Sequence, residues 1–488
     1  MKRVLFFLLI AVAGHAYGQH EIEAGQTDSL SGEYRVREKS AVKTISVEVG
    51  LNMVMRGFNR FILNDEYAQI NLSSMKKNLS TLPVWDTNKF STNLIAHPYH
   101  GSMYFNSSRI NGYNFYQSIP FTFGGSLMWE YLMETKPPSV NDLVSTTIGG
   151  TALGEITFRL SDLVLDSRTT GVERIGRELI GGVLSPIRFL NRLTTRELWT
   201  RKPVKGNYLQ PSPFNLEFYV GEKDIDDIKN DKTIRRMTLG MMTEYGEITG
   251  ESIENPYDWF RISGEVNVGE SNFYLSQVNG IGAIFNKGLY EANEVSVSGG
   301  IFQHFNYYNL KTQTKDKDIF TPYYISEAAS LGPGLVLQKR KQDVRMQTAL
   351  FASGIGLGAS ISDYFEIDDR DYNMGSGFSL KLNTEVRIVE KYTIKLFSEN
   401  YIIYTWKGID EEIELKDLSM SQIDFLNVQG DRSTAKLHVF GASISYEIND
   451  KIHLIFKNRF FTRNTSYKYF PPVHYKSNEI FVGMGWYV

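Results

Sequence analysis

Alternation of apolar and polar side chains dominates the C-terminal half of the chain. In the segment 376–390, Phe, Leu, Val and Ile occupy one set of alternate positions, and Ser, Lys, Asn, Glu and Arg occupy the other. A two-residue period of this kind predicts a β-strand with one apolar and one polar face. Because the polar face is rich in charge over many strands, the pattern is typical of a membrane barrel with lipid outside and a wet lumen, rather than of a soluble sandwich.

The alternation recurs until the chain ends at Val488. Short turns and long polar loops alternate between most of the segments, which is the usual asymmetry of an outer-membrane barrel. We therefore predict an all-β fold with a helical insert, namely a transmembrane antiparallel β-barrel over 211–488, and a location in the outer membrane. About twelve strands are expected, over 213–221, 234–247, 258–268, 272–287, 294–309, 321–339, 343–360, 376–390, 391–406, 435–449, 450–465 and 477–488.

The N-terminal part is organised differently. Residues 1–18 combine a basic start, a short apolar run and small residues, which is typical of a cleavable signal peptide ending at Gly18; a retained anchor is the alternative. Residues 19–95 are mostly polar and aperiodic, and predict a periplasmic leader and loop region. Within them, Thr44 to Met55 is apolar enough for either a helix or a further strand.

Residues 96–170 predict a three-helix insert. Pro98 near the start of the first segment favours helix initiation, and that helix should run to about Asn111. A second helix is expected over 121–134 and ends before Pro137, because proline breaks a helix. Ser139 then supplies a helix cap, and the third helix should continue to about Leu165. This insert is expected to form a plug-like segment.

Residues 171–210 form a basic, amphipathic linker interrupted at Pro186. One interpretation is a helix that lies on an anionic membrane surface. The simpler interpretation is a solvated linker helix on the periplasmic side, since basic faces are common on surface helices.

Composition excludes several functions. The chain has no cysteine, so disulfides, zinc–thiolate sites and thiol nucleophiles are excluded. The net charge of −3 offers no general attraction to nucleic acid, and we expect no nucleic-acid partner.

Region 85–166 carries a dense set of polar and glycine motifs: Trp85-Asp86, His97-Pro98-Tyr99-His100-Gly101, Trp129-Glu130, Pro138-Ser139 with Asn141-Asp142, Gly149-Gly150 with Gly154-Glu155, and Arg159-Leu160-Ser161. The region resembles a bacterial family known only as a domain of unknown function, common in Bacteroidetes and in other Gram-negative envelopes. The resemblance implies an outer-membrane protein and brings no established activity. The polar residues of this signature are Trp85, Asp86, Arg109, Trp129, Ser139, Asn141, Glu155, Arg159 and Ser161.

The insert also holds the candidate catalytic residues His97, His100, Glu130, Glu134 and Asp142. Two imidazoles and several carboxylates suit either a divalent metal that activates water, or a histidine base beside a carboxylate. The alternative is structural, with these groups bonding to the barrel and capping helices inside a plug. We favour the plug, because the His-x-x-His spacing is weak evidence and no recognised hydrolase or phosphate-loop motif is present.

The favoured function is a barrel whose lumen is filled or gated by the insert, with a channel, receptor or structural role. The alternatives are an outer-membrane hydrolase acting on lipid or glycan, and a structural barrel that docks a periplasmic protein partner through 171–205. No cofactor is predicted, although a divalent metal is the alternative at the histidines. Outer-membrane lipids are the expected surroundings in every case.

Overall fold

The computed structural model describes most of the chain from residue 38 onward, so the predicted signal peptide and the start of the leader lie outside the described residues. The ranges described are 38–203, 205–209, 212–228, 232–249, 253, 255–269, 273–310, 312–313, 319–320, 324–367, 370–410, 415 and 418–488.

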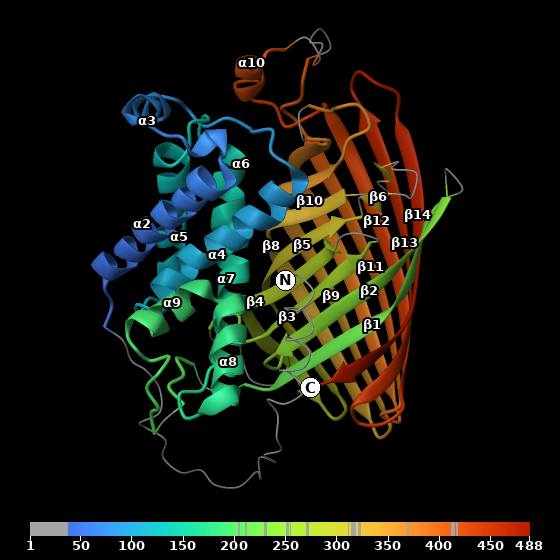
Figure 1. Ribbon diagram of the computed structural model, residues 1–488. Coiled ribbons are helices and arrows are strands. Elements are labelled where there is room, and N and C mark those ends of the chain that lie inside the picture. The colour runs from blue at the N-terminus through green and yellow to red at the C-terminus, as the bar shows by residue number, and fades with distance from the viewer. Residues whose placement is uncertain are drawn as a thin grey trace.

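A closed antiparallel barrel of twelve strands forms the C-terminal part (Figure 1). The last strand pairs with the first along eleven positions, from Glu217 opposite Tyr487 to Asp227 opposite Ser477, and this pairing removes the free edges. The barrel strands are β1 Phe214–Asp227, β2 Lys232–Tyr245, β3 Phe260–Val268, β4 Phe273–Ala292, β5 Val295–Asn309, β8 Tyr324–Lys341, β9 Val344–Ile361, β10 Tyr372–Ile388, β11 Tyr392–Thr405, β12 Ser433–Glu447, β13 Ile452–Tyr467 and β14 Val473–Tyr487.

All twelve predicted strands are confirmed, with ends that differ by a few residues. A small hairpin of β6 (Thr312–Gln313) and β7 (Ile319–Phe320) lies within the long β5–β8 connection. The tight turns 342–343, 389–391 and 448–451 lie at the barrel end where the chain terminates, and the long connection 406–432 lies at the opposite end (Figure 1). We call these the turn end and the loop end.

The two faces of the wall have the predicted chemistry. On β10, Phe378 and Leu380 are 64% and 49% exposed on the outside, whereas Ser379 and Lys381 between them are buried. Lys381 forms an ion pair with Glu327 of β8, two strands away. An apolar exterior and a charged interior are the arrangement that lipid on one side and water on the other require.

Eight α-helices precede the barrel in the part of the chain that the structure describes, and we call residues 41–194 the helical segment. They are α2 Ala41–Phe58, α3 Leu72–Leu79, α4 His97–Arg109, α5 Phe115–Leu132, α6 Val140–Val144, α7 Gly150–Val164, α8 Gly171–Leu184 and α9 Pro186–Thr194. The predicted three-helix insert corresponds to α4, α5 and the α6–α7 pair, and the ambiguous stretch 44–55 is helical. Among the described helices, none has both the length and the apolar content needed to cross a bilayer.

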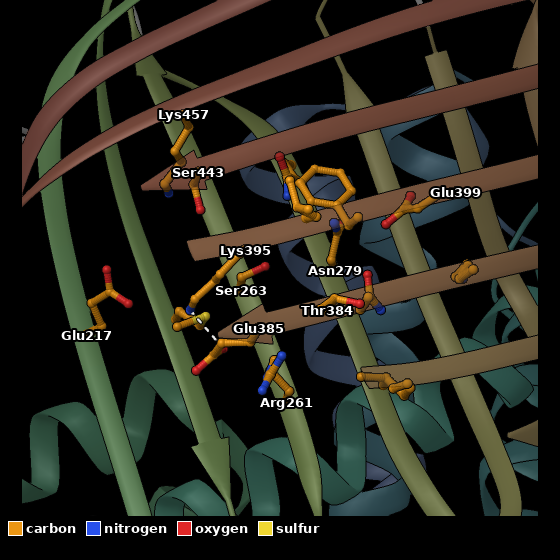
Figure 2. A pocket seen from close by; sticks show the side chains of 18 of the residues that line it. Glu217, Arg261, Ser263, Asn279, Thr384, Glu385, Lys395, Glu399, Ser443 and Lys457 are labelled. Carbon is orange, nitrogen blue, oxygen red and sulfur yellow. Dashed lines mark ion pairs between the residues drawn. The ribbon is translucent and has the colours of Figure 1, made fainter. Parts of the chain in front are cut away.

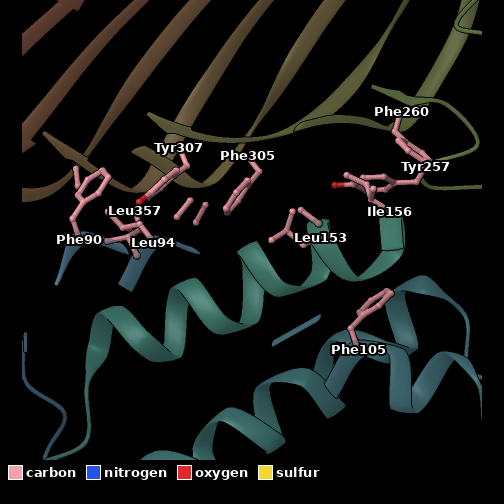
Figure 3. Close-up of a cluster of buried hydrophobic side chains, with 14 of the residues drawn as sticks. Phe90, Leu94, Phe105, Leu153, Ile156, Tyr257, Phe260, Phe305, Tyr307 and Leu357 are labelled. Carbon is pink, nitrogen blue, oxygen red and sulfur yellow. The ribbon is translucent and has the colours of Figure 1, made fainter. Parts of the chain in front are cut away.

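The helical segment packs against the outside of the barrel wall (Figure 3). On β5, His304 and Asn306 line the lumen cavity, whereas Phe305 and Tyr307 point the other way and belong to one apolar cluster with α7. In that cluster, Ile156 of α7 lies against the outward side of β4 and β5, next to Gly280. A separate apolar cluster lies on the lumen side, so the barrel wall lies between the two apolar clusters.

The predicted placement of the helical plug therefore needs correction. The chain is a channel-like twelve-stranded barrel with an N-terminal helical segment, but no described helix residue lines the lumen cavity. The physical reason is that the outward faces of β2, β3, β5, β8 and β10 carry large aromatic residues, which are buried against the helical segment. Side chains of the wall itself occupy the lumen instead.

Candidate functional site

Ion pairs that reach across the barrel constrict the lumen. Glu265 of β3 pairs with Lys223 of β1 and, at 2.6 Å, with Arg459 of β13. Arg459 also pairs with Glu479 at 3.0 Å and donates a hydrogen bond to Gln277 of β4. Because β13 and β4 are five strands apart in the barrel order, Arg459 connects opposite parts of the wall.

A cavity of about 260 Å³, lined by both charged and apolar side chains, lies inside the barrel beside this network (Figure 2). Lys395 and Glu385 pair within it at 3.4 Å, and Arg261 points toward the same place from β3. Both signs of charge are present, so the lumen has no strong preference for cations or anions on this basis.

A second polar site lies in the helical segment, near the loop end. His97 is the first residue of α4, and its Nε2 lies 3.4 Å from Oδ2 of Asp142 at the start of α6. Glu130 of α5 completes the group: one ligand atom from each of the three side chains lies within 4.8 Å of the others. We call His97, Glu130 and Asp142, with the adjoining Asp86, the histidine–carboxylate cluster.

Local hydrogen bonds fix the carboxylates of this cluster. Glu130 is 2% exposed, and its Oε2 accepts a 2.8 Å hydrogen bond from the backbone N–H of Ser139. Asn141 donates to Asp86 and to Asp142, both at 2.9 Å, and therefore holds these two carboxylates side by side. The N–H of Asp142 donates to Oγ of Ser139, which is the predicted helix cap.

Burial strongly perturbs the acidic groups at this end. Burial, and then the neighbouring Asp86 and Glu130, raise the pKa of Asp142 well above its usual range. Burial also raises the pKa of Glu134 to about 7, opposed by the hydrogen bond that Trp129 donates to it. These carboxyl groups therefore favour the protonated state unless a cation joins them.

His100 lies apart from the cluster. Its ring packs against Tyr104 and, edge to face, against Trp129, with centroids 4.7 and 5.1 Å away. Of the five predicted catalytic residues, the structure brings His97, Glu130 and Asp142 together. Glu134 lines a small neighbouring cavity with Asp86 and Asp142, and His100 packs in the helix interface.

Other signature residues form a structural clamp. Glu155 of α7 is fully buried and pairs with Arg109 of α4 at 2.8 Å and with Arg159 at 2.9 Å. Arg159 also pairs with Asp258 in the β2–β3 connection at 2.9 Å. The clamp therefore joins two helices to the barrel. Among the described residues, it forms no ion pair with the histidine–carboxylate cluster, so its role is structural.

Two signature residues remain. The backbone N–H of Trp85 donates to the side chain of Asn427 in the long loop, which ties the start of the family region to the loop end. Ser161 accepts a 3.1 Å hydrogen bond from Arg188 of α9. Both are structural contacts.

Three basic residues of 171–210 are buried, whereas Arg196 and Arg201 are exposed. Arg174 and Arg192 are buried and pair with Glu178, and Arg188 pairs with Asp162. The exposed side of α8 is apolar instead, with Val172, Ile175, Leu179 and Val183 all more than half exposed. The described part of this linker therefore presents an apolar surface, which differs from the solvated basic helix that we favour from the sequence.

The buried polar residues of α2 were not predicted as part of the helical segment, because the polar, aperiodic stretch 19–95 is typical of a leader. Glu48 accepts a 3.0 Å hydrogen bond from Ser107 of α4, and Asn52 accepts one from Tyr104. Thr44, Glu48 and Asn52 recur every four residues and are all buried, so one polar stripe of α2 faces the other helices. That spacing was visible in the sequence and would have indicated a helix with a polar interior face.

Among models of known families, one match covers part of the chain. Residues 82–187 match the model of a domain of unknown function (DUF3943). No relative was found among curated proteins.

Solved barrels are similar only at the level of general shape. They include the NanC porin (12% identity, TM-score 0.26, covering 56% of this chain and 98% of that chain) and the KdgM porin in complex with disordered oligogalacturonate (9%, 0.22, 56% and 98%). Another is the outer membrane channel DcaP of Acinetobacter baumannii (8%, 0.23, 57% and 98%). At such scores, the barrel assignment depends on this chain's own strand pairing.

Proposed function

We propose that the protein is an outer-membrane barrel of the channel class, with a lumen narrow enough to restrict passage to ions and small solutes. The observation that carries this function is the closed barrel, whose cavity of about 260 Å³ adjoins the ion pair and the hydrogen bond by which Arg459 of β13 reaches β3 and β4. A wide aqueous pore needs more strands than twelve, or a lumen free of crossing side chains.

We predict that one substitution widens the constriction in the lumen and raises the conductance. Arg459→Ala removes the side chain that connects β13 with Glu265 and Gln277, so a several-fold rise in single-channel conductance is expected in planar bilayers. Arg345→Ala is the matched control, because Arg345 is exposed and pairs only with Glu390 near a tight turn. If neither the wild type nor Arg459→Ala passes current, the channel function is wrong.

The helical segment is proposed to share the bilayer with the barrel. Apolar side chains are exposed on its outer helices: on α2, Glu48 and Asn52 are buried, while Met53 and Val54 are 62% and 70% exposed. An apolar outer surface continuous with the apolar wall suits lipid, since each exposed apolar group is better placed in hydrocarbon than in water.

Spin labels test this placement cleanly, because the chain has no cysteine. A label at Val54→Cys is expected to be reached by oxygen more readily than by a water-soluble nickel chelate in reconstituted vesicles. Lys451→Cys, in the exposed turn between β12 and β13, should show the reverse preference. Equal behaviour of the two labels would place the helical segment in water.

For the hydrolase alternative, one histidine is the better candidate for the general base. His97 lies beside Asp142, as a general base needs, whereas His100 packs against aromatic rings. The alternative of a periplasmic docking surface through 171–205 loses support, because Arg174, Arg188 and Arg192 are engaged in internal ion pairs. Cleavage after Gly18 and export by a signal peptide remain part of the proposal.

A further inference from the structure

The histidine–carboxylate cluster lacks a balancing cation among the described residues. Asp86, Glu130 and Asp142 converge, and the only ion pair recorded for any of them is the 3.4 Å contact between His97 and Asp142. Arg370 approaches, but it donates to the backbone oxygen of Asp86 and not to the carboxylate. Buried carboxylates without a cation are costly, so the site needs either protons or a metal ion.

A second observation favours the metal ion. Glu130 is 2% exposed, and its Oε2 accepts the hydrogen bond from the backbone N–H of Ser139. A buried carboxylate that has a ligand atom within 4.8 Å of an imidazole nitrogen and of a second carboxylate is suited to coordination.

We propose that His97, Glu130 and Asp142 bind one divalent cation of the Zn²⁺ or Mn²⁺ type in the helical segment. One imidazole and two carboxylates form a mixed nitrogen and oxygen ligand set, which suits these ions better than Ca²⁺, an ion that prefers six or more oxygens. Asn141 is a positioning residue, because it orients Asp142 and Asp86 through its amide.

A small cavity adjoins the site near the loop end. Asp86, Glu134 and Asp142 line this cavity of about 20 Å³, and Asp424 of the long loop also lines it. Lys136 pairs with Asp424 at 3.4 Å and holds that loop against the helices.

Metal analysis of the purified full chain tests the proposal. After chelation and dialysis against Zn²⁺ or Mn²⁺, the wild type should retain about one equivalent, and its thermal midpoint should rise because the ion binds only the folded state. Asp142→Asn and His97→Gln are expected to weaken binding at least about tenfold, the usual effect of losing a metal-site partner. His100→Gln and Glu173→Gln are the matched controls and should bind normally.

Folding of each variant is checked by circular dichroism and by the heat-dependent gel mobility of the barrel. Less than one fifth of an equivalent in the folded wild type would overturn the proposal, as would unchanged binding in folded Asp142→Asn. Because this measurement reads the ion directly, its failure is distinguishable from failure of the conductance experiment.

Discussion

Replacing Glu155 with alanine is expected to destabilise the helical segment by about 3–5 kcal/mol, the range for removing one partner of a buried ion pair. The carboxylate is fully buried and pairs with both Arg109 and Arg159. Its loss leaves two guanidinium groups inside the structure, and only Arg159 keeps another carboxylate, that of Asp258. The helices should therefore separate from the wall while the barrel stays closed.

Hydrogen exchange of peptides from 97–164 during a urea titration measures this effect separately from the barrel strands. The matched control is Glu173→Ala, whose carboxylate is 46% exposed and pairs with Arg177 on the surface of α8. That pair should contribute less than about 1 kcal/mol. Equal losses in the two variants, or simultaneous unfolding of the strands in Glu155→Ala, would contradict the role of the clamp.

The barrel could be predicted from the sequence because each strand carries its own signal. Phe378 to Ile388 alternate without interruption, and the resulting two-residue period identifies a strand without knowledge of its neighbours. The closure between β1 and β14 follows once all strands are counted, since an even antiparallel set brings both ends to the same side.

The placement of the helices could not be predicted in the same way. A helix whose polar residues face the neighbouring helices is compatible with a place in a wet lumen and equally with a place in lipid. The sequence pattern therefore does not distinguish these two locations. The deciding information lies in pairs far apart in the chain, such as Gln303 of β5 donating to the backbone of Ile148, 155 residues away. The aromatic residues Phe305 and Tyr307 were read only as strand positions, although they mark the wall that the helices cover.

The candidate site was partly predictable. Spacing predicted Ser139 as a cap, and this cap is present. Spacing also predicted Glu130 and Glu134 on one helix face, but α5 ends at Leu132 and Glu134 lies beyond it. Spacing could not separate His97 from His100. The π-helical turn Thr92–Ala96 before α4 and the path of α6 decide which imidazole meets Asp142.

The backbones of α4 and α7 are in close contact where the two helices cross. Gly101 of α4 and Gly150 of α7 meet so closely that a Cβ built on Gly101 would lie 1.8 Å from the backbone oxygen of Thr146. A Cβ on Gly150 would lie 2.6 Å from Cα of Gly101. Glycines in this part of the chain, which lower helix propensity, are therefore explained by the backbone that packs against them.

Gly101→Ala is expected to destabilise the helical segment by about 1–3 kcal/mol or more, as overpacking does, because the obstacle is rigid backbone rather than a flexible side chain. Gly124→Ala on α5 is the matched control, since a Cβ there meets nothing within 4 Å. An exposed helical glycine replaced by alanine should stabilise by about 0.5–1 kcal/mol, so the two variants should shift the urea midpoint in opposite directions. A neutral or stabilising Gly101→Ala would show that α4 and α7 are not in backbone contact, and the crossing that brings His97 to Asp142 would then be wrong.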